Sequence, residues 1–339
     1  MAEKFVVTRP YPGSGIGSNL VSLAGAVWLA GRLGRGVIVD WRNSNFLRDK
    51  TANLFTEFLE PVGEIQGVQV QYADGAEVPW DAADGTEGVR VLDLLEVGRL
   101  VSSASDDRYL VLTPFHGYER IGAGGDALER FRRLRSFFAS IAPREFLRRE
   151  IEEFAASHDF ADSFVVAVNI ATGNGDYRRG SPFYGRVKVE VFDHKERFLR
   201  MVSYARAMAL RRLPDYLRER AVTFVATDDA TMHELLLRLP NAVTRRTVFP
   251  PPGAGRSFAD YDVPGYTDRE AFADIVADHF LLARCHAVVR NPSMFGTYGL
   301  VSTNFYNGNL RNIETMYPGY LGRAAVRRAR RIPTRLRRK

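Results

Sequence analysis

Three glycines near the N-terminus, Gly13, Gly15 and Gly17, are spaced as in a loop that binds phosphate. They follow an apolar stretch that begins at Phe5 and precede an apolar helix that extends to Trp28. Glycines at such a turn let backbone N–H groups approach an anion, and the helix N-terminus adds a partial positive charge. Because the third glycine of the dinucleotide-binding fingerprint is missing, the loop indicates either an anion site or a simple turn.

Polar residues follow three apolar runs in the second half of the chain, where strands are expected to end. These polar segments are 169–176, 227–229 and 290–295. The first half has the same arrangement at 13–19 and 40–43. In an open parallel sheet the carboxyl ends of the strands share one edge, and ligands bind there. The sequence therefore predicts two sheets, each with a ligand-binding edge.

The order of apolar and helical segments is typical of a layered α/β protein. A segment rich in arginine is expected to be helical over 126–154, with a break at Pro143, and to join two domains. Strands are expected at 36–42, 68–72, 109–113, 164–170, 222–226 and 286–290, and further helices at 189–212 and 268–283.

Size and composition fit such a protein. The 339 residues are enough for two domains, and 45% apolar with 26% charged residues is ordinary for a soluble globular chain. The single cysteine, Cys285, excludes an internal disulfide and suits a reducing compartment. The apolar stretch 21–31 is too short to span a bilayer. We therefore expect a cytoplasmic protein.

The net charge of +7 comes from the end of the chain. Residues 323–339 hold nine Lys or Arg and no acid, so the rest is close to neutral. Such a tail is either a solubilising end or a contact for an anionic surface or partner. The candidate role of the tail is peripheral contact with the inner face of a membrane. Nucleic acid is not the expected partner.

Several stretches of the chain together resemble the rhizobial nodulation fucosyltransferases (nodulation protein Z), which are relatives of eukaryotic α-1,6-fucosyltransferases. The resemblance covers roughly residues 4–305 and is most specific near the N-terminus. The stretches that show it are 15–17, 22–26, 34–44, 55–62, 137–144, 173–175, 227–228 and 278–285.

This resemblance implies a GT-B type α/β fold, with two Rossmann-like domains and a cleft between them. The expected boundaries are 1–155 for an acceptor-side domain, 156–320 for a domain that binds the nucleotide sugar, and 321–339 for the basic tail. The implied reaction transfers fucose or another hexose from a GDP-sugar to a hydroxyl of a glycan or natural product. The implied transfer inverts the sugar carbon and uses no metal.

Three residues are candidates to contact the nucleotide: Asp278 matches the family's base-binding acid, Asp228 matches a family motif, and Ser293 follows Pro292 at an expected strand end. Asp278 suits the guanine base, because one carboxylate can accept from both N1–H and N2–H₂; its alternative is an ordinary acid on a helix face. Ser293 can donate its hydroxyl to the diphosphate or belong to a turn. Asp228 either serves the nucleotide or caps the helix that follows it.

The second-domain loop departs from the family pattern His-x-Arg-x-Gly-Asn-Gly. Gly173 and Asn174 fit that pattern, but Asn169 and Ala171 replace the histidine and the arginine. In the family this arginine holds the leaving diphosphate in place of a metal ion. Loss of such a charge-assisted contact in a desolvated site could remove several kcal/mol of transition-state stabilisation.

The expected catalytic residues lie just after that loop. Arg178 or Arg179 would supply the missing charge. The alternative is that both arginines face the solvent. Asp176 is the expected general base for the acceptor hydroxyl. Asp40 is a second candidate base, and its alternative role is to hold the turn at Trp41. No His, Cys and Glu spacing indicates a metal site, so the GDP-sugar is the one small molecule expected.

Two other functions stay open from the sequence. The missing arginine fits a non-catalytic descendant that binds a nucleotide or a glycan. An NAD-dependent enzyme is the less favoured alternative. It is suggested by Asp40, which lies about twenty residues after the glycine loop, as a ribose-binding acid would.

Overall fold

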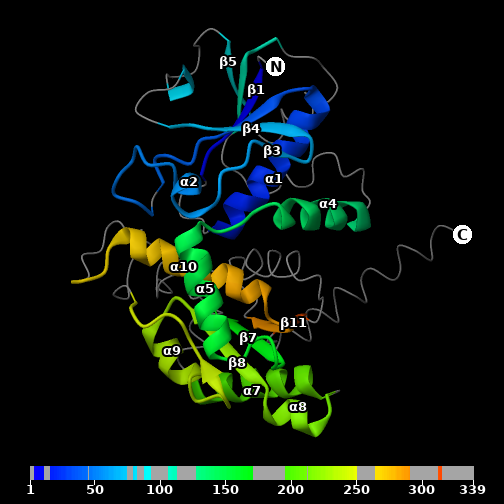
Figure 1. Cartoon of the computed structure of the whole chain (residues 1–339), viewed down its shortest axis with the longest axis vertical. Helices are drawn as coiled ribbons and strands as arrows, with labels where there is room; N and C mark the ends of the chain where they lie inside the picture. Colours follow the sequence, from blue (N-terminus) through cyan, green and yellow to red (C-terminus); the bar gives the residue numbers. More distant parts are fainter. Residues whose placement is uncertain are drawn as a thin grey trace, which may run out of the picture.

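The computed structural model describes residues 4–10, 16–44, 46–74, 79–81, 88–92, 106–112, 127–170, 195–211, 213–249, 264–290 and 312–314. Within this part of the chain, two sheets follow one another along the longest axis of the molecule (Figure 1). Helix α10 (Asp268–Ala283) lies between them, and α5 (Glu145–Ser157) runs from α10 alongside the second sheet. Among the described residues every strand pair is parallel except that of β3 (Glu64–Ile65) with β4 (Val68–Tyr72). The expected α/β class with parallel sheets is confirmed.

The first sheet is built around a βαβ unit. Its central strand β1 (Phe5–Thr8) pairs in parallel with β2 (Gly36–Val39) on one side and with β6 (Tyr109–Leu112) on the other. Because α1 (Ile16–Leu33) joins β1 to β2, the loop that leaves β1 starts at the carboxyl edge of this sheet. Across the sheet the strands are β3 (Glu64–Ile65), β4 (Val68–Tyr72), β2 (Gly36–Val39), β1 (Phe5–Thr8), β6 (Tyr109–Leu112) and β5 (Val89–Leu92).

Two glycines after α1 fix how the chain enters β2. Gly34 has a φ of 65°, a conformation that suits glycine just past a helix end. Gly36 lies against the ring of Phe5, where an added Cβ would sit 2.8 Å from two ring carbons. The tight turn and the close approach together bring β2 alongside β1.

The side chain of Asn53 ties α2 (Leu54–Phe58) to the carboxyl edge of the first sheet. Its Oδ1 accepts from the backbone N–H of Phe55 and so caps the helix. Its Nδ2 donates to the carbonyl of Val39 at 2.7 Å and to that of Ala73 at 2.8 Å. This one buried amide therefore links a helix start to the ends of two strands.

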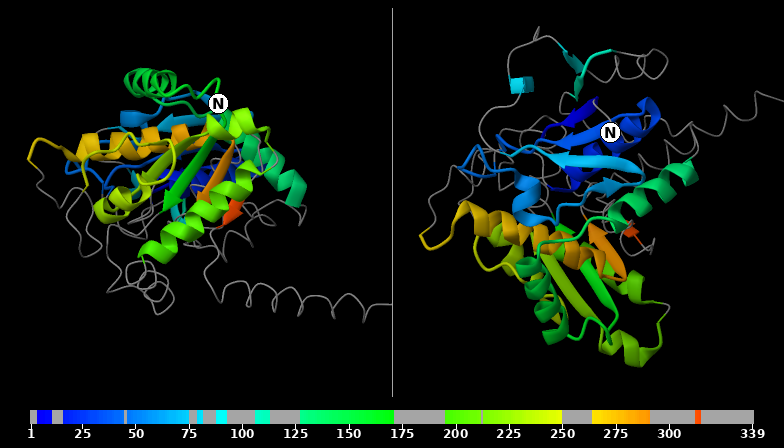
Figure 2. Two further views of the ribbon diagram at one scale, coloured as in Figure 1. Left: turned by 90° about the horizontal axis from the view of Figure 1, so that it is seen from below. Right: turned by 45° about the horizontal axis from the view of Figure 1, so that its top comes forward.

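The second sheet is parallel throughout. Figure 2 (left) shows its central strands side by side, pointing the same way. Across the sheet the strands are β11 (Asn312–Glu314), β10 (Ala287–Arg290), β7 (Val165–Ile170), β8 (Val222–Thr227) and β9 (Ala242–Val243). The helices that accompany these strands along the chain are α7 (Lys195–Leu210), α8 (Asp215–Glu219) and α9 (Ala230–Leu236).

Helix α10 (Asp268–Ala283) connects the two halves. It begins with a capping box between Thr267 and Glu270. Phe272 is fully buried, with its ring 4.9 Å from that of Phe46 and 5.0 Å from that of Phe58. Thus a helix of the second half completes the core of the first.

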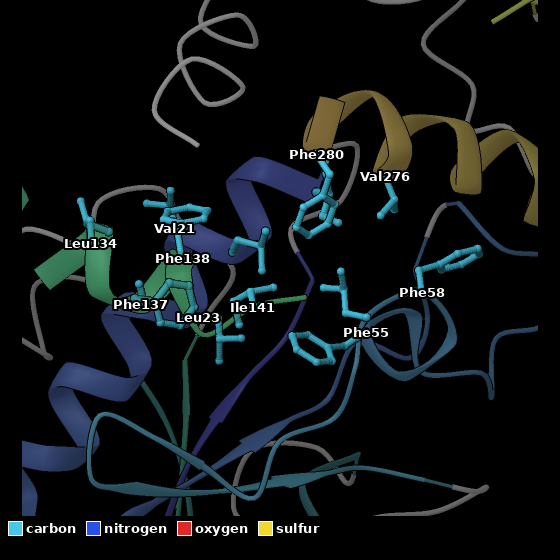
Figure 3. Packing of buried hydrophobic residues seen from close by; sticks show 14 of the residues in the cluster. Val21, Leu23, Phe55, Phe58, Leu134, Phe137, Phe138, Ile141, Val276 and Phe280 are labelled. Atoms are coloured by element: carbon cyan, nitrogen blue, oxygen red, sulfur yellow. The ribbon is translucent and has the colours of Figure 1, made fainter. Parts of the chain in front are cut away.

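The same hydrophobic cluster continues along α10. Val276 and Phe280 point from α10 toward side chains of the first half, among them Phe55 and Phe58 (Figure 3). Two more helices contribute to this cluster, α4 (Ala127–Ala139) and α5 (Glu145–Ser157).

The helices expected from the sequence are confirmed most closely. The expected helix 268–283 coincides with α10. The expected break at Pro143 lies between α4 and α5. Strands β3, β5, β9 and β11 were not predicted, since each has only two to four residues and the sequence before β5 is polar. The proposed boundary at 155 falls in the last turn of α5 and stays a prediction. None of the described helices is long and apolar enough to cross a membrane.

Candidate functional site

The carboxyl edge of the second sheet gathers residues from three neighbouring strands. Asn169, near the end of β7, pairs in register with Ala226 of β8 and with Arg290 of β10. Ile170 pairs with Thr227 in the same way. The three polar segments expected to hold a ligand therefore leave the sheet at a shared edge, as the sequence predicted.

Adjacent aspartates at the end of β8 have different roles. Asp229 is the N-cap of α9: its backbone is extended and its carboxylate accepts from the N–H of Met232 at 2.8 Å. The alternative that Asp228 caps this helix is wrong, because the helix begins one residue later than that role requires. Asp228 lies half-buried at the sheet edge, and its expected role toward the nucleotide stays a prediction.

The expected base-binding residue, Asp278, is buried within α10, with 8% of its surface exposed. Its Oδ2 lies 3.8 Å from Nη2 of Arg246, and its Oδ1 has no hydrogen-bond partner in the described part of the protein. Burial raises the pKa of Asp278 to about 6; Asp274 adds to this shift, and Arg246 and Arg245 oppose it. Asp278 is thus a carboxylate held in a low-dielectric site with acceptor capacity unused.

Arg246 is the residue that sequence reasoning missed. It is 5% exposed, and its Nε has no hydrogen-bond partner among the described residues. A buried donor left unpaired costs about 1–3 kcal/mol, so an orphaned donor beside an orphaned acceptor is a reason to expect a ligand. The only sequence signal was a pair of arginines just after a short apolar run at 242–243.

The neighbouring arginine anchors this segment of backbone. Arg245 forms ion pairs with Asp274 of α10 and with Glu150 of α5. Tyr266 donates its hydroxyl to the same Asp274 carboxylate. Burial, together with this carboxylate, raises the pKa of Tyr266 above its ordinary value. The network holds the backbone at Arg245 against α5 and α10, next to the point where Arg246 meets Asp278.

At the corresponding edge of the first sheet, Asp40 is buried and fully paired. Arg42 donates to both of its oxygens, from Nε at 2.7 Å and from Nη2 at 3.0 Å. Trp80 donates its Nε1–H to Oδ2 at 2.7 Å, and Arg9 lies 3.9 Å away. Burial alone would raise the pKa of Asp40, but the bonds from Arg42 and Trp80 bring it below its ordinary value.

These contacts support the structural interpretation of Asp40. A carboxylate whose two oxygens accept three hydrogen bonds, and whose pKa is lowered, is a poor general base. It is equally poorly placed to accept from the hydroxyls of a nicotinamide-dinucleotide ribose. The alternative of an NAD-dependent enzyme therefore loses the residue that suggested it.

The remaining expected site residues divide into two groups. Gly17 is the second residue of α1 and is buried at its N-terminal turn. The others lie outside the described residues: Gly13, Gly15, Gly173, Asn174, Asp176, Arg178, Arg179 and Ser293. Their roles stay predictions. Within the described ranges, no group of three or more His, Cys, Asp or Glu side chains could hold a metal ion.

The fold is of the GT-B type, and known proteins of this type match it along most of the chain. The crystal structure of the fucosyltransferase NodZ from Bradyrhizobium superposes with a TM-score of 0.60 at 21% identity, over 88% of this chain and 93% of that one. Arabidopsis thaliana FUT1, in a variant solved with GDP, gives a TM-score of 0.54 at 13% identity, over 93% of this chain and 70% of that one. The expected fold class is confirmed.

The sequence comparisons agree with the structural ones. Residues 2–79 match the family described as nodulation protein Z. The nodulation protein Z of Bradyrhizobium diazoefficiens is 27% identical over 310 residues, which are 86% of this chain and 76% of that protein. The predicted resemblance to the nodulation fucosyltransferases is therefore confirmed.

Proposed function

We propose that this protein is a glycosyltransferase that moves fucose or another hexose from a GDP-sugar to a hydroxyl group of a glycan or natural product. The principal support is Asp278, a buried carboxylate with an unpaired oxygen, at the position that the resemblance assigns to the guanine base. A similar structure, the α-1,6-fucosyltransferase NodZ soaked with GDP-fucose, has a TM-score of 0.56 at 21% identity.

In the proposed reaction the acceptor hydroxyl oxygen attacks the anomeric carbon of the sugar. Asp176 takes the hydroxyl proton, the bond from that carbon to the β-phosphate oxygen breaks, and GDP leaves. Attack from the face opposite the leaving group inverts the anomeric carbon. A base in contact with the hydroxyl contributes typically 10²–10⁴-fold to such a step.

Charge on the departing diphosphate is the main electrostatic problem of this reaction. We assign its stabilisation to Arg178 or Arg179, to the hydroxyl of Ser293 and to backbone N–H groups of the loop that contains Gly13 and Gly15. Because Ala171 replaces the expected arginine, that loop has a larger share of the task than in the family pattern. In this proposal the reaction needs no metal ion, so transfer should be unchanged in EDTA.

The experiment measures release of the nucleoside diphosphate from GDP-fucose, GDP-mannose and a UDP-sugar, each with and without a chitooligosaccharide acceptor. With the acceptor we expect GDP release from at least one GDP-sugar and no UDP release from the UDP-sugar. Asp278→Asn should lose this release, and Arg238→Met, an exposed arginine paired with Glu196, is the control. If neither Arg178→Ala nor Arg179→Ala slows release, the proposed replacement of the missing arginine is wrong.

A second candidate function is a nucleotide-binding or glycan-binding protein without catalysis, which Ala171 favours. Tight GDP binding without turnover of any GDP-sugar, across a panel of acceptors, would support it. Measurable release of GDP in the presence of an acceptor would contradict it.

Two further proposals are a cytoplasmic location and contact of residues 321–339 with anionic lipid. Cosedimentation with anionic vesicles tests the lipid contact.

A further inference from the structure

Two buried side chains of opposite charge lie close together, Arg246 just after β9 and Asp278 within α10. Arg246 and Asp278 are 5% and 8% exposed, and Nη2 of Arg246 lies 3.8 Å from Oδ2 of Asp278. This separation is too long for a hydrogen bond, so neither group satisfies the other. An arginine donor, Nε–H, and an aspartate acceptor, Oδ1, have no partner among the described residues.

Guanine offers a complementary edge to such a pair. Along its edge lie two acceptors, N7 and O6, followed by two donors, N1–H and N2–H₂. A guanidinium donates well to O6 and N7, and a carboxylate accepts well from N1–H and N2–H₂. An arginine and an aspartate side by side can therefore contact the whole edge at once.

The same pair disfavours adenine. Adenine would place its N6–H₂ donor toward the guanidinium and its N1 acceptor toward the carboxylate. A donor would then face a donor and an acceptor would face an acceptor. A site that leaves buried polar groups unpaired with the wrong ligand discriminates strongly, by up to about 10⁴–10⁵-fold where it is built to hydrogen-bond the right one.

We infer that Arg246 is a specificity-determining residue of the nucleotide site: its guanidinium donates to O6 and N7 of guanine, while Asp278 accepts from N1 and N2. This inference rests on the proposed function, because it requires a guanine nucleotide as the donor. The ion pairs of Arg245 with Asp274 and Glu150 hold the backbone beside it, so that Arg246 is presented from an anchored position.

The test compares three nucleotides by isothermal titration calorimetry with the full chain. GDP carries the complete edge, 6-thio-GDP has a weakly accepting sulfur in place of O6, and IDP lacks the N2 amine. For the wild-type protein we expect both analogues to bind about 10-fold more weakly than GDP. We call this loss of affinity relative to GDP the penalty for each analogue. Arg246→Met should abolish the penalty for 6-thio-GDP but keep that for IDP. Asp278→Asn should abolish the penalty for IDP but keep that for 6-thio-GDP.

The matched control is another buried arginine whose donors are satisfied. Arg206 is 8% exposed and donates from Nε to Oγ1 of Thr223 at 2.6 Å and from Nη2 to the carbonyl of Ala221 at 3.0 Å. Arg206→Met should retain both analogue penalties. Should Arg246→Met fail to fold in a thermal melt, Arg246→Lys keeps a charge beside Asp278 but cannot form the two parallel bonds, and is expected to lose most of the penalty for 6-thio-GDP.

The outcomes separate this inference from the proposed function. If Arg246→Met or Arg246→Lys retains the full penalty for 6-thio-GDP while the wild-type protein still releases GDP from a GDP-sugar, the inference is overturned and the function stands. If the wild-type protein binds GDP no better than UDP and ADP, the proposed function fails and the inference fails with it.

Discussion

Asp40 and Asp278 are both buried aspartates, one in each half of the molecule, and they differ in what surrounds them. The carboxylate of Asp40 accepts three hydrogen bonds from Arg42 and Trp80, and its pKa is lowered. The carboxylate of Asp278 has an arginine 3.8 Å away and an oxygen without a partner, and its pKa is raised to about 6. Burial alone therefore does not mark a functional acid.

The difference lies in whether the protein itself satisfies the buried charge. A fully paired carboxylate orders the chain around it, and its removal leaves its partners uncompensated. A partly paired carboxylate makes the unliganded protein less stable than it could be, and a ligand with matching donors removes that cost. Substitutions at these and neighbouring aspartates should therefore differ in whether they change stability or ligand binding.

The largest effect is expected for Asp40→Asn. The buried guanidinium of Arg42 would lose its counter-charge and Trp80 would lose a charged acceptor, so the free energy of unfolding should fall by about 3–5 kcal/mol. Urea denaturation measures this change. The matched variant Asp278→Asn should leave the unfolding free energy unchanged or increase it. Equal losses in the two variants would show that the two aspartates do not differ in this way.

The next effect concerns binding. Asp278→Asn replaces one of the two carboxylate oxygens by an NH₂ donor. It should weaken GDP binding about 100-fold, which corresponds to about 2.7 kcal/mol. Calorimetry with GDP measures the loss. Asp40→Asn, studied at a temperature where circular dichroism shows it folded, should bind GDP as the wild-type protein does. Loss of affinity in that variant would place Asp40 in the nucleotide site.

The third effect is a pH dependence. As the pH falls through about 6, Asp278 takes up a proton and can no longer accept from both guanine donors, so GDP affinity should fall about tenfold per unit below that value. The free energy of unfolding without GDP should change with pH in the opposite direction. Because the pKa of Asp278 is raised in the folded protein, protonation of this residue stabilises the fold. This stabilisation is fully present below about pH 3.8 and is lost as the pH rises through about 6.

Titrations of GDP affinity between pH 5 and pH 8 test this dependence. The charged and titratable groups around Asp278 are Asp274, Arg245, Arg246 and Tyr266. Asp278→Asn should remove the pH dependence. A persisting transition near pH 6 in that variant would assign it to another group.

The smallest effect distinguishes the adjacent aspartates at the end of β8. Asp229→Ala removes the cap of α9 and should lower the unfolding free energy by about 1 kcal/mol. Asp228→Ala leaves that capping bond in place and should instead slow GDP release from the GDP-sugar. Urea denaturation and the release assay measure the two effects. Unchanged release in Asp228→Ala would remove this residue from the proposed site.

Local features were predictable from the sequence. Pro143 separates two helices because proline disrupts a helix interior, and the expected helix at 268–283 was found between the same residues. Asp278 could be proposed because its chemistry matches guanine and its position matches a family motif. These inferences needed only neighbouring residues or a known pattern.

Features that depend on distant contacts were not predictable. The partner Trp80 lies 40 residues from Asp40, so the sequence could not show that Asp40 was already satisfied. Arg246 meets a residue of α10 only because the fold brings β9 and that helix together. The choice between Asp228 and Asp229 as the helix cap depended on a helix start that propensity does not define to one residue.

Helix α10 has a consequence for how the molecule unfolds. It follows β9 in the chain, yet Phe272 completes a core made with Phe46 and Phe58 of the first half, and Asp278 lies further along the same helix. A fragment containing only the second half would expose that apolar face to water, and the first half alone would lose its cover. The two Rossmann-like domains should therefore melt as one cooperative unit, in a single calorimetric transition that GDP shifts to higher temperature as a whole.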